Sequence, residues 1–123
     1  MNFDDATLAL LHETDEVEIE TVSEDGVMHR TTIWVVADER DAYVRSVRGA
    51  RGRWYRELRE RPDGALVVDD RRLAFRTVAA TDPATVELVS DLFRAKYGER
   101  SAARTASMLT PETLPTTLRL EPA

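Results

Sequence analysis

The sequence contains no cysteine, a single lysine, and only five glycines and five prolines among 123 residues. Without cysteine the chain forms no disulfide, and a domain of this length buries enough surface to fold without a structural metal. No apolar run approaches the ~20 residues that cross a bilayer, and the acidic residues 1–5 lack the basic segment of a secretory signal. We therefore expect one cytoplasmic domain over residues 1–123, with no membrane partner.

Charge is unevenly distributed along the chain. The formal net charge is −6, from 23 acidic and 17 basic residues, which argues against nucleic acid as a general partner. Residues 45–61 reverse this sign, because they hold seven arginines against two glutamates. Such an excess indicates an anion site, since guanidinium groups match phosphate or carboxylate oxygens in paired hydrogen bonds. The alternative is that these arginines solvate an exposed helix face.

Patterns of apolar and polar residues predict about six short antiparallel strands. Residues 16–21 alternate strictly, which places Val17, Ile19 and Thr21 on one face and three glutamates in water. Turn residues then lead into a longer strand, so the first two strands form a hairpin. The remaining predicted strands cover residues 27–37, 42–47, 65–69, 72–79 and 116–120.

Three helices are expected beside these strands, and the small, polar residues 101–108 form either a short helix or a loop. Asp4 caps the first, and a second begins at Arg53 after a turn that contains two glycines. Asp82 followed by Pro83 starts the third, which ends at Gly98. Many short strands with few helices favour a mainly β fold, a small antiparallel barrel with flanking helices; an α+β sandwich is the alternative.

Self-contained hydrolytic chemistry is not indicated by the sequence. It has no cysteine nucleophile and no Gly-x-Ser-x-Gly elbow to expose a serine beside a base. His12 and His29 lack the close spacing of a zinc pair, so structural or solvent-facing roles are expected for both, and no metal site is predicted.

The strand, turn and helix around residues 45–53 are the best candidate for a binding site. Arg45 and Ser46 stand at the strand end, and Arg48 and Arg53 stand in and after the turn. Backbone N–H groups at a helix start carry partial positive charge, so arginines added there would complete a phosphate cradle. The turn fits neither the nucleotide-triphosphate loop nor the Gly-x-Gly-x-x-Gly fingerprint.

Four segments carry a resemblance to a known family: Tyr43 to Gly49, Arg53 to Arg56, Lys96 to Gly98 and Thr117 to Pro122. Together they resemble the domain-of-unknown-function family 2255 over about residues 31–122. That family is similar to the flavin and deazaflavin split-barrel superfamily, which includes pyridoxamine-phosphate oxidases and deazaflavin-dependent nitroreductases. The resemblance implies a single split-barrel domain that forms a homodimer, with FMN or a deazaflavin coenzyme between the subunits.

The resemblance also implies which residues meet the cofactor. Its phosphate end would be bound by Arg45, Ser46, Arg48 and Arg53. Its ring would be bordered by Thr31, Thr32 and Trp34, and buried with help from Tyr43 and Trp54, although core packing is an equal alternative for Trp54. The chain departs from the superfamily pattern in two places, because Glu57 replaces an asparagine of the deazaflavin branch and arginines replace a lysine of the phosphate oxidases.

These observations lead to one expected function and two alternatives. The first is a redox protein in which the flavin-type cofactor performs hydride transfer and the polypeptide supplies position and electrostatics. The second is a noncatalytic split barrel that binds another small anionic ligand. The third, contact of the arginine- and glycine-containing residues 48–53 with RNA, is opposed by the acidic chain.

Overall fold

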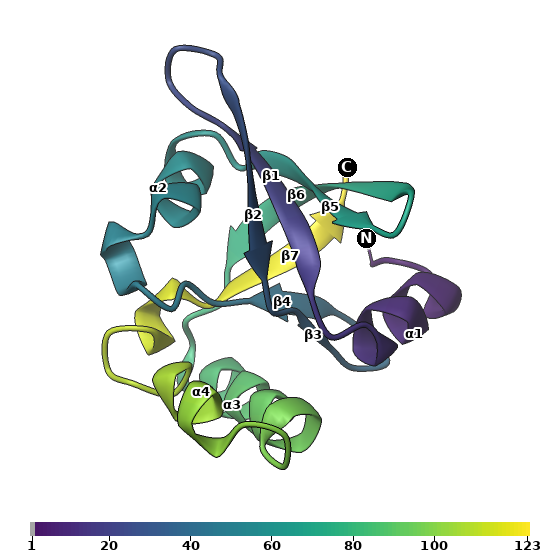
Figure 1. The fold of residues 1–123 in the computed structure, drawn as a ribbon, viewed down its shortest axis with the longest axis vertical. Coiled ribbons are helices and arrows are strands. Elements are labelled where there is room, and N and C mark those ends of the chain that lie inside the picture. The colour runs from purple at the N-terminus through teal and green to yellow at the C-terminus, as the bar shows by residue number, and fades with distance from the viewer. Residues whose placement is uncertain (1) are drawn as a thin grey trace.

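The computed structural model describes residues 2–123, and over these residues seven strands form one sheet with four α-helices around it (Figure 1). The strands are β1 (Val17–Val22), β2 (Met28–Ile33), β3 (Val36–Ala37), β4 (Ala42–Val44), β5 (Asp63–Val68), β6 (Arg71–Ala79) and β7 (Leu118–Pro122). The helices are α1 (Asp5–Glu13), α2 (Arg53–Glu60), α3 (Pro83–Tyr97) and α4 (Ala102–Ser107), with 3₁₀ turns η1 (Gly49–Arg51) and η2 (Leu114–Thr116). The mainly β class with antiparallel strands is confirmed.

The predicted helix starts are confirmed by their caps. The Thr7 N–H donates to Asp4 Oδ1 at 2.8 Å, and the Thr85 N–H donates to Asp82 Oδ2 at 3.0 Å. Each bond satisfies one of the N–H groups that a helix start leaves without an intrahelical acceptor. No helix within residues 2–123 has both the length and the apolar character that crossing a membrane requires.

The sheet closes on itself along a seam at Trp34 and Val35. One long strand over residues 27–37 was expected, and this is wrong: the chain leaves β2 after Ile33 and enters β3 at Val36. These two strands are the outer edges of the order β2-β1-β5-β6-β7-β4-β3. The three peptide steps between Ile33 and Val36 span at most about 11 Å, so the sheet must curl until its edges nearly meet. The result is a barrel that is open along one line, a split barrel.

Two apolar cores lie on the two sides of this curled sheet. The larger one fills the barrel and includes Leu11, Ile19 and Phe75, all of which are fully buried. The smaller one lies between α3 and the β3–β4 hairpin, where Phe93 packs with Tyr43. Tyr43 was expected to help bury a cofactor ring, but it belongs to this second core.

Glu20 corrects the prediction that the three glutamates of residues 16–21 face water. It is 4% exposed, and the Nε atoms of Arg30 and Arg72 each donate to its carboxylate at 2.9 Å. In the sheet, β1 lies between β2 and β5. Arginine side chains from β2 and from β6, the strand beyond β5, therefore reach the Glu20 carboxylate and cover it. Burial acts to raise the pKa of Glu20, but the hydrogen bonds from Arg72 and Arg30 outweigh it and lower the pKa.

Candidate functional site

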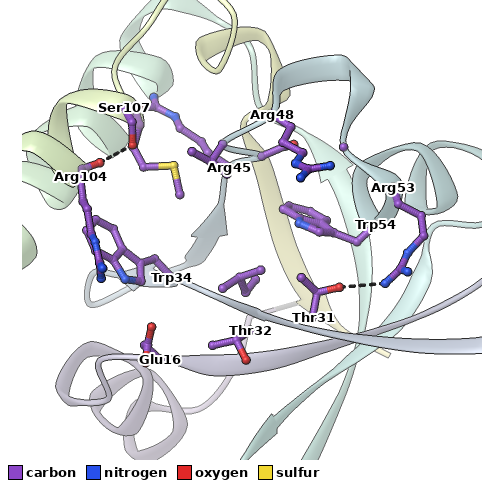
Figure 2. Close-up of a pocket in the computed structure, with 15 residues that line it drawn as sticks. Glu16, Thr31, Thr32, Trp34, Arg45, Arg48, Arg53, Trp54, Arg104 and Ser107 are labelled. Carbon is purple, nitrogen blue, oxygen red and sulfur yellow. Dashed lines mark hydrogen bonds between the residues drawn. The ribbon is translucent and has the colours of Figure 1, made fainter.

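A cavity of about 480 Å³ lies beside the seam, a volume within the range of small-molecule sites (Figure 2). Its walls come from the end of β2 and the seam, the loop after β4, the start of α2, and α4. All eight residues that the sequence implied line it: Thr31, Thr32, Trp34, Arg45, Ser46, Arg48, Arg53 and Trp54. Their convergence is a feature of the structure, and their contact with a cofactor stays a prediction.

The loop after β4 is shaped by two glycines for different reasons. Gly49 has φ +66°, the left-handed region that favours glycine, and its carbonyl accepts a hydrogen bond from Ser46 Oγ at 2.8 Å. Gly52 has φ −59°, an angle that any residue can adopt. It is needed because a Cβ there would collide with Ser46 Oγ. The two glycines let the loop fold tightly before α2.

Arg45 forms part of the cavity floor and is fully buried. Its Nε donates to Thr117 Oγ1 at 2.9 Å, and its terminal nitrogens donate to Ser90 Oγ, Met108 O and Val86 O at 2.8–3.1 Å. All four acceptors are neutral, and burial lowers the pKa of Arg45 to about 10, so the group stays charged at neutral pH. Arg45 is thus a buried cation that holds the cavity floor to α3, to the residue after α4 and to the residue before β7.

Ser46 also has internal partners. Its backbone N–H donates to Thr116 Oγ1 at 3.0 Å, and its hydroxyl bonds to the Gly49 carbonyl. A direct contact between a phosphate and either Ser46 or Arg45 stays a prediction, since both groups are already bonded within the protein.

Trp34 forms one aromatic wall, and α3 holds it in place. The Tyr97 ring stacks on the indole with centroids 3.8 Å apart and planes 4° from parallel. The Lys96 ammonium donates to Val35 O at 2.6 Å and to Leu11 O at 2.8 Å, which fixes the seam next to the indole. Burial lowers the pKa of Lys96 to about 8, although Asp15 opposes this shift. Trp34 is therefore a rigid wall built on α3.

Trp54 forms the other aromatic wall from the first turn of α2. It is 7% exposed and packs edge-on against Tyr55, with centroids 6.4 Å apart. Most of its surface belongs to the barrel core, and the remainder lines the cavity. Trp54 is therefore mainly a core residue, and its contact with a cofactor ring stays a prediction.

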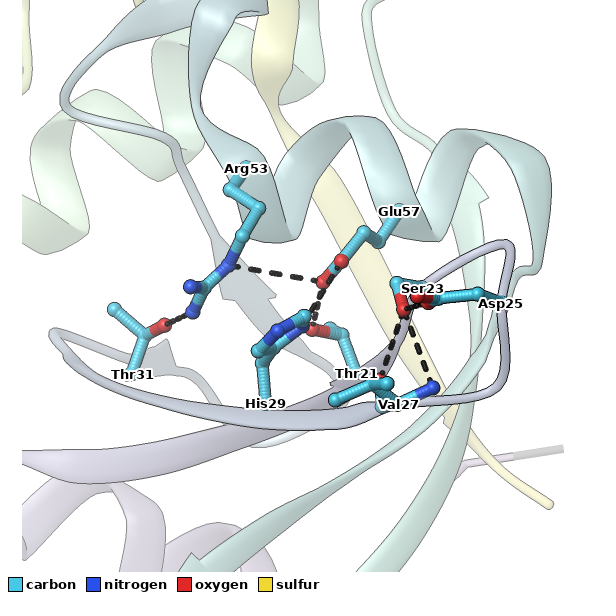
Figure 3. Close-up of polar contacts among 8 residues, drawn as sticks. All are labelled: Thr21, Ser23, Asp25, Val27, His29, Thr31, Arg53 and Glu57. Atoms are coloured by element: carbon cyan, nitrogen blue, oxygen red, sulfur yellow. Dashed lines mark hydrogen bonds and ion pairs between the residues drawn. The ribbon is translucent and has the colours of Figure 1, made fainter.

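Arg53 connects the cavity to a polar cluster between α2 and the β1–β2 hairpin (Figure 3). Its terminal nitrogen donates to Thr31 Oγ1 at 3.1 Å, and its Nε lies 3.9 Å from Glu57 Oε1. The Glu57 side chain is 11% exposed, and its carboxylate also contacts Thr21 Oγ1 at 2.6 Å and His29 Nδ1 at 3.1 Å. Glu57 is a residue at which the chain departs from the superfamily pattern, and its carboxylate thus helps to hold the Arg53 guanidinium in place.

The seven arginines of residues 45–61 do not all lie at the cavity. Arg45, Arg48 and Arg53 line the cavity. Arg59 bonds the Tyr55 hydroxyl and Arg61 bonds the Glu24 carbonyl, both on exposed surface away from the cavity. The positive segment therefore lies partly at the cavity and partly on a solvated helix face, and binding of an anion by it stays a prediction.

Sequence reasoning missed the wall that α4 contributes. Arg104, Ser107 and Met108 line the cavity from that helix, and Glu16 lines it from the turn before β1. These residues lie more than 50 positions along the chain from the arginine-rich loop, or about 30 before it, so no local pattern connects them. The only available signal was a single arginine in a segment of small residues.

Solved structures with a similar fold include proteins that differ in the functions their names state. HutZ, a heme storage protein from Vibrio cholerae, matches with TM-score 0.68 and 15% identity over 100% of this chain and 92% of its own. A candidate pyridoxamine 5′-phosphate oxidase from Listeria innocua matches with TM-score 0.66 and 16% identity over 96% and 91%. An F420 reductase matches with TM-score 0.56 and 20% identity over 94% and 91%. At these identities the likeness establishes the split-barrel fold.

Among curated proteins, no sequence matches the chain. The family described as uncharacterized protein conserved in bacteria (DUF2255) matches residues 7–120, a span that includes the seam, the arginine-rich loop, α2 and α4. The matched span also holds every residue that lines the cavity. With its split-barrel fold, the chain belongs to this DUF2255 family.

Proposed function

We propose that this protein is a redox protein that binds FMN or a deazaflavin coenzyme in the cavity between Trp34 and Trp54. The observation that carries the proposal is the composition of the cavity: two aromatic walls, and four arginines against one glutamate. A planar ring system with an anionic group is the ligand that this combination favours. The names of the pyridoxamine-phosphate-oxidase-like and F420-reductase neighbours support a flavin-type cofactor.

Each part of the cavity has a separate task in this proposal. Arg48 and Arg53 would bind the phosphate, with the buried charge of Arg45 behind them to strengthen the positive field. Thr31, Thr32 and the Trp34 indole would border the ring. The bound cofactor would supply the electron and hydride chemistry, and the protein would supply orientation and exclusion of water.

The energetics require both ends of the cavity. Three charge-assisted hydrogen bonds contribute roughly 5 to 9 kcal/mol, whereas association costs an estimated 4 to 15 kcal/mol. Micromolar binding needs about 8 kcal/mol net, so phosphate contacts alone fall short. Burial of the ring against the aromatic walls must supply the remainder.

We infer that a second copy of the chain completes this burial, as a homodimer. Val47, on the cavity wall, is 56% exposed, although apolar side chains of this size are usually buried. A partner subunit that covers Val47 would close the cavity over the ring. Analytical ultracentrifugation tests this: a dimer that Val47→Glu dissociates is expected, and a wild-type monomer at micromolar concentration contradicts it.

Titration with FMN and with riboflavin tests the cofactor proposal. The Arg48→Ala/Arg53→Ala double variant is expected to bind FMN at least about tenfold more weakly, because it lacks two charge-assisted contacts to phosphate. Riboflavin, which has no phosphate, should bind both proteins equally. The matched control is Arg56→Ala/Arg71→Ala, which removes the same charge from exposed positions outside the cavity. Wild-type protein that takes up neither FMN nor deazaflavin would refute the proposal.

A second candidate is a noncatalytic protein that binds another small anionic ligand. The observation in its favour is that, apart from Glu16, the ionisable side chains lining the cavity are arginines, which do not exchange protons at neutral pH. Heme is one planar anion of this kind, and the name of the HutZ neighbour supports testing it. Thermal shift with FMN, deazaflavin and heme separates the candidates, because the ligand that binds the native state raises Tm.

A further inference from the structure

The cavity has positive charge at two separate places. Figure 2 shows Arg104 toward the end of the cavity that Trp34 lines, with Arg53 toward the end that Trp54 lines. Arg104 comes from α4, whereas Arg48 and Arg53 come from the loop and helix that follow β4. A single phosphate is a compact group and is held by guanidinium groups that converge on it. Guanidinium groups at opposite ends of a cavity therefore do not serve one phosphate.

Arg104 is also free to bind a ligand. Across residues 2–123 the structure records no hydrogen bond or ion pair for its guanidinium; the bonds recorded for Arg104 involve its backbone N–H and carbonyl. Other arginines in this part of the fold are paired, as Arg94 is with Asp91 and Arg100 is with Asp15. The Arg104 guanidinium is a planar fork of donors that lines the cavity and, among the described residues, has no acceptor bonded to it. Such a group is suited to bind a carboxylate or another oxyanion.

The residues around Arg104 indicate what kind of molecule would carry this carboxylate or oxyanion. The Trp34 indole lines the same cavity, and Tyr97 stacks on one of its faces. Ser107 lies one helical turn further along α4, and its hydroxyl bonds back to the Arg104 carbonyl at 2.5 Å. Glu16 lines the same cavity, toward the Trp34 end in Figure 2, so its carboxylate would oppose an anion bound there. The pattern suits an aromatic or otherwise planar molecule with an acidic substituent.

We propose that Arg104 forms a second anion subsite, which binds the carboxylate or other oxyanion of a planar ligand separately from the phosphate site at Arg48 and Arg53. This inference rests on the proposed function in that both sites belong to one cavity. Two sources would present the same chemistry there. One is an acidic aromatic substrate, and the other is the anionic tail of a deazaflavin coenzyme that extends beyond its phosphate.

Binding of a matched pair of probes to the cofactor-free protein tests the subsite. Nicotinate and nicotinamide share one ring and differ in the carboxylate, and tryptophan fluorescence or ligand-observed NMR reports the binding of both. Wild-type protein is expected to prefer nicotinate, and Arg104→Gln to remove this preference, with about a tenfold loss for nicotinate and none for nicotinamide. Arg104→Lys should restore part of the loss, because it keeps the charge without the fork. Glu16→Gln should strengthen nicotinate binding, because it removes a carboxylate that repels the ligand.

Cofactor titrations on the same variants distinguish the two sources. An acidic substrate is indicated when Arg104→Gln weakens nicotinate and leaves the deazaflavin coenzyme unchanged. A cofactor tail is indicated when Arg104→Gln weakens the deazaflavin coenzyme and leaves FMN unchanged. The control Arg56→Gln, which removes an exposed charge outside the cavity, should change none of these affinities.

Two results overturn the subsite. One is an Arg104→Gln protein that binds nicotinate and the deazaflavin coenzyme as tightly as wild type does. The other is an Arg104→Gln protein that loses FMN as strongly as Arg48→Ala/Arg53→Ala does, because Arg104 would then belong to the phosphate site. Failure of the proposed function looks different: no flavin binds at all, while the nicotinate preference and its loss in Arg104→Gln persist.

Discussion

Replacement of Arg45 by methionine is expected to destabilise the protein strongly, although it neither overpacks the core nor leaves a large cavity in it. The change leaves four acceptors without their donor, among them the Val86 and Met108 carbonyls and the Ser90 hydroxyl. Unsatisfied buried acceptors cost about 1 to 3 kcal/mol each, but removal of the buried charge also relieves a desolvation penalty. The net loss should be about 3 to 5 kcal/mol, a large fraction of the 5 to 15 kcal/mol typical of a domain.

Urea denaturation measures this loss directly. For a slope of about 1.5 kcal/mol per M, the midpoint should fall by roughly 2 to 3 M. Hydrogen exchange should accelerate most in α4 and at the start of β7, because Arg45 ties both to the cavity floor. Arg45→Lys should lie between the two proteins, since one ammonium reaches fewer acceptors than the guanidinium fork does. An Arg45→Met protein with a wild-type midpoint would show that this network contributes no net stability.

The remaining predictions concern Lys96 and Gly52. The folded-state pKa of Lys96, about 8, lies below the ordinary value of 10.5, so the unfolded chain binds more protons between these values and stability should rise as pH increases from about 8 to 10.5. The neutral amine still has two hydrogens for its two carbonyl acceptors, and chemical denaturation across this window should show a rise that is missing in Lys96→Met. Gly52→Ala should cost about 1 to 3 kcal/mol in wild type, because the new Cβ collides with Ser46 Oγ, and much less in a Ser46→Ala background. Equal costs in both backgrounds would mean that Ser46 is not the obstacle.

Local patterns predicted most of the elements correctly. The caps at Asp4 and Asp82 act over three residues, so the sequence contains all of their chemistry. The strand over residues 27–37 was predicted as continuous because its β-branched residues carry no break signal. It divides at Trp34 because the two sheet edges must be joined there, which is a property of the closed sheet.

About half of the residues that line the candidate site were predicted from the sequence. The arginine-rich loop and the β2 residues were found because they are close in sequence or fit the family pattern, and the structure brings them into one cavity. Arg104 and Glu16 were missed because their approach depends on how α4 and β1 pack. Glu20 was misplaced because alternation describes one strand, whereas its burial depends on side chains from its neighbours.

The sequence by itself determined the mainly β class, the helix ends and a local excess of positive charge in an acidic chain, since each of these depends on residues within a few positions of one another. Only the tertiary structure decided which arginines serve the fold and which face the cavity. Arg45 and Arg48 are three residues apart, yet one is fully buried among neutral acceptors and the other is exposed at the cavity. That difference arises from α3, α4 and β7, whose acceptors lie 41 to 72 positions away from Arg45 along the chain.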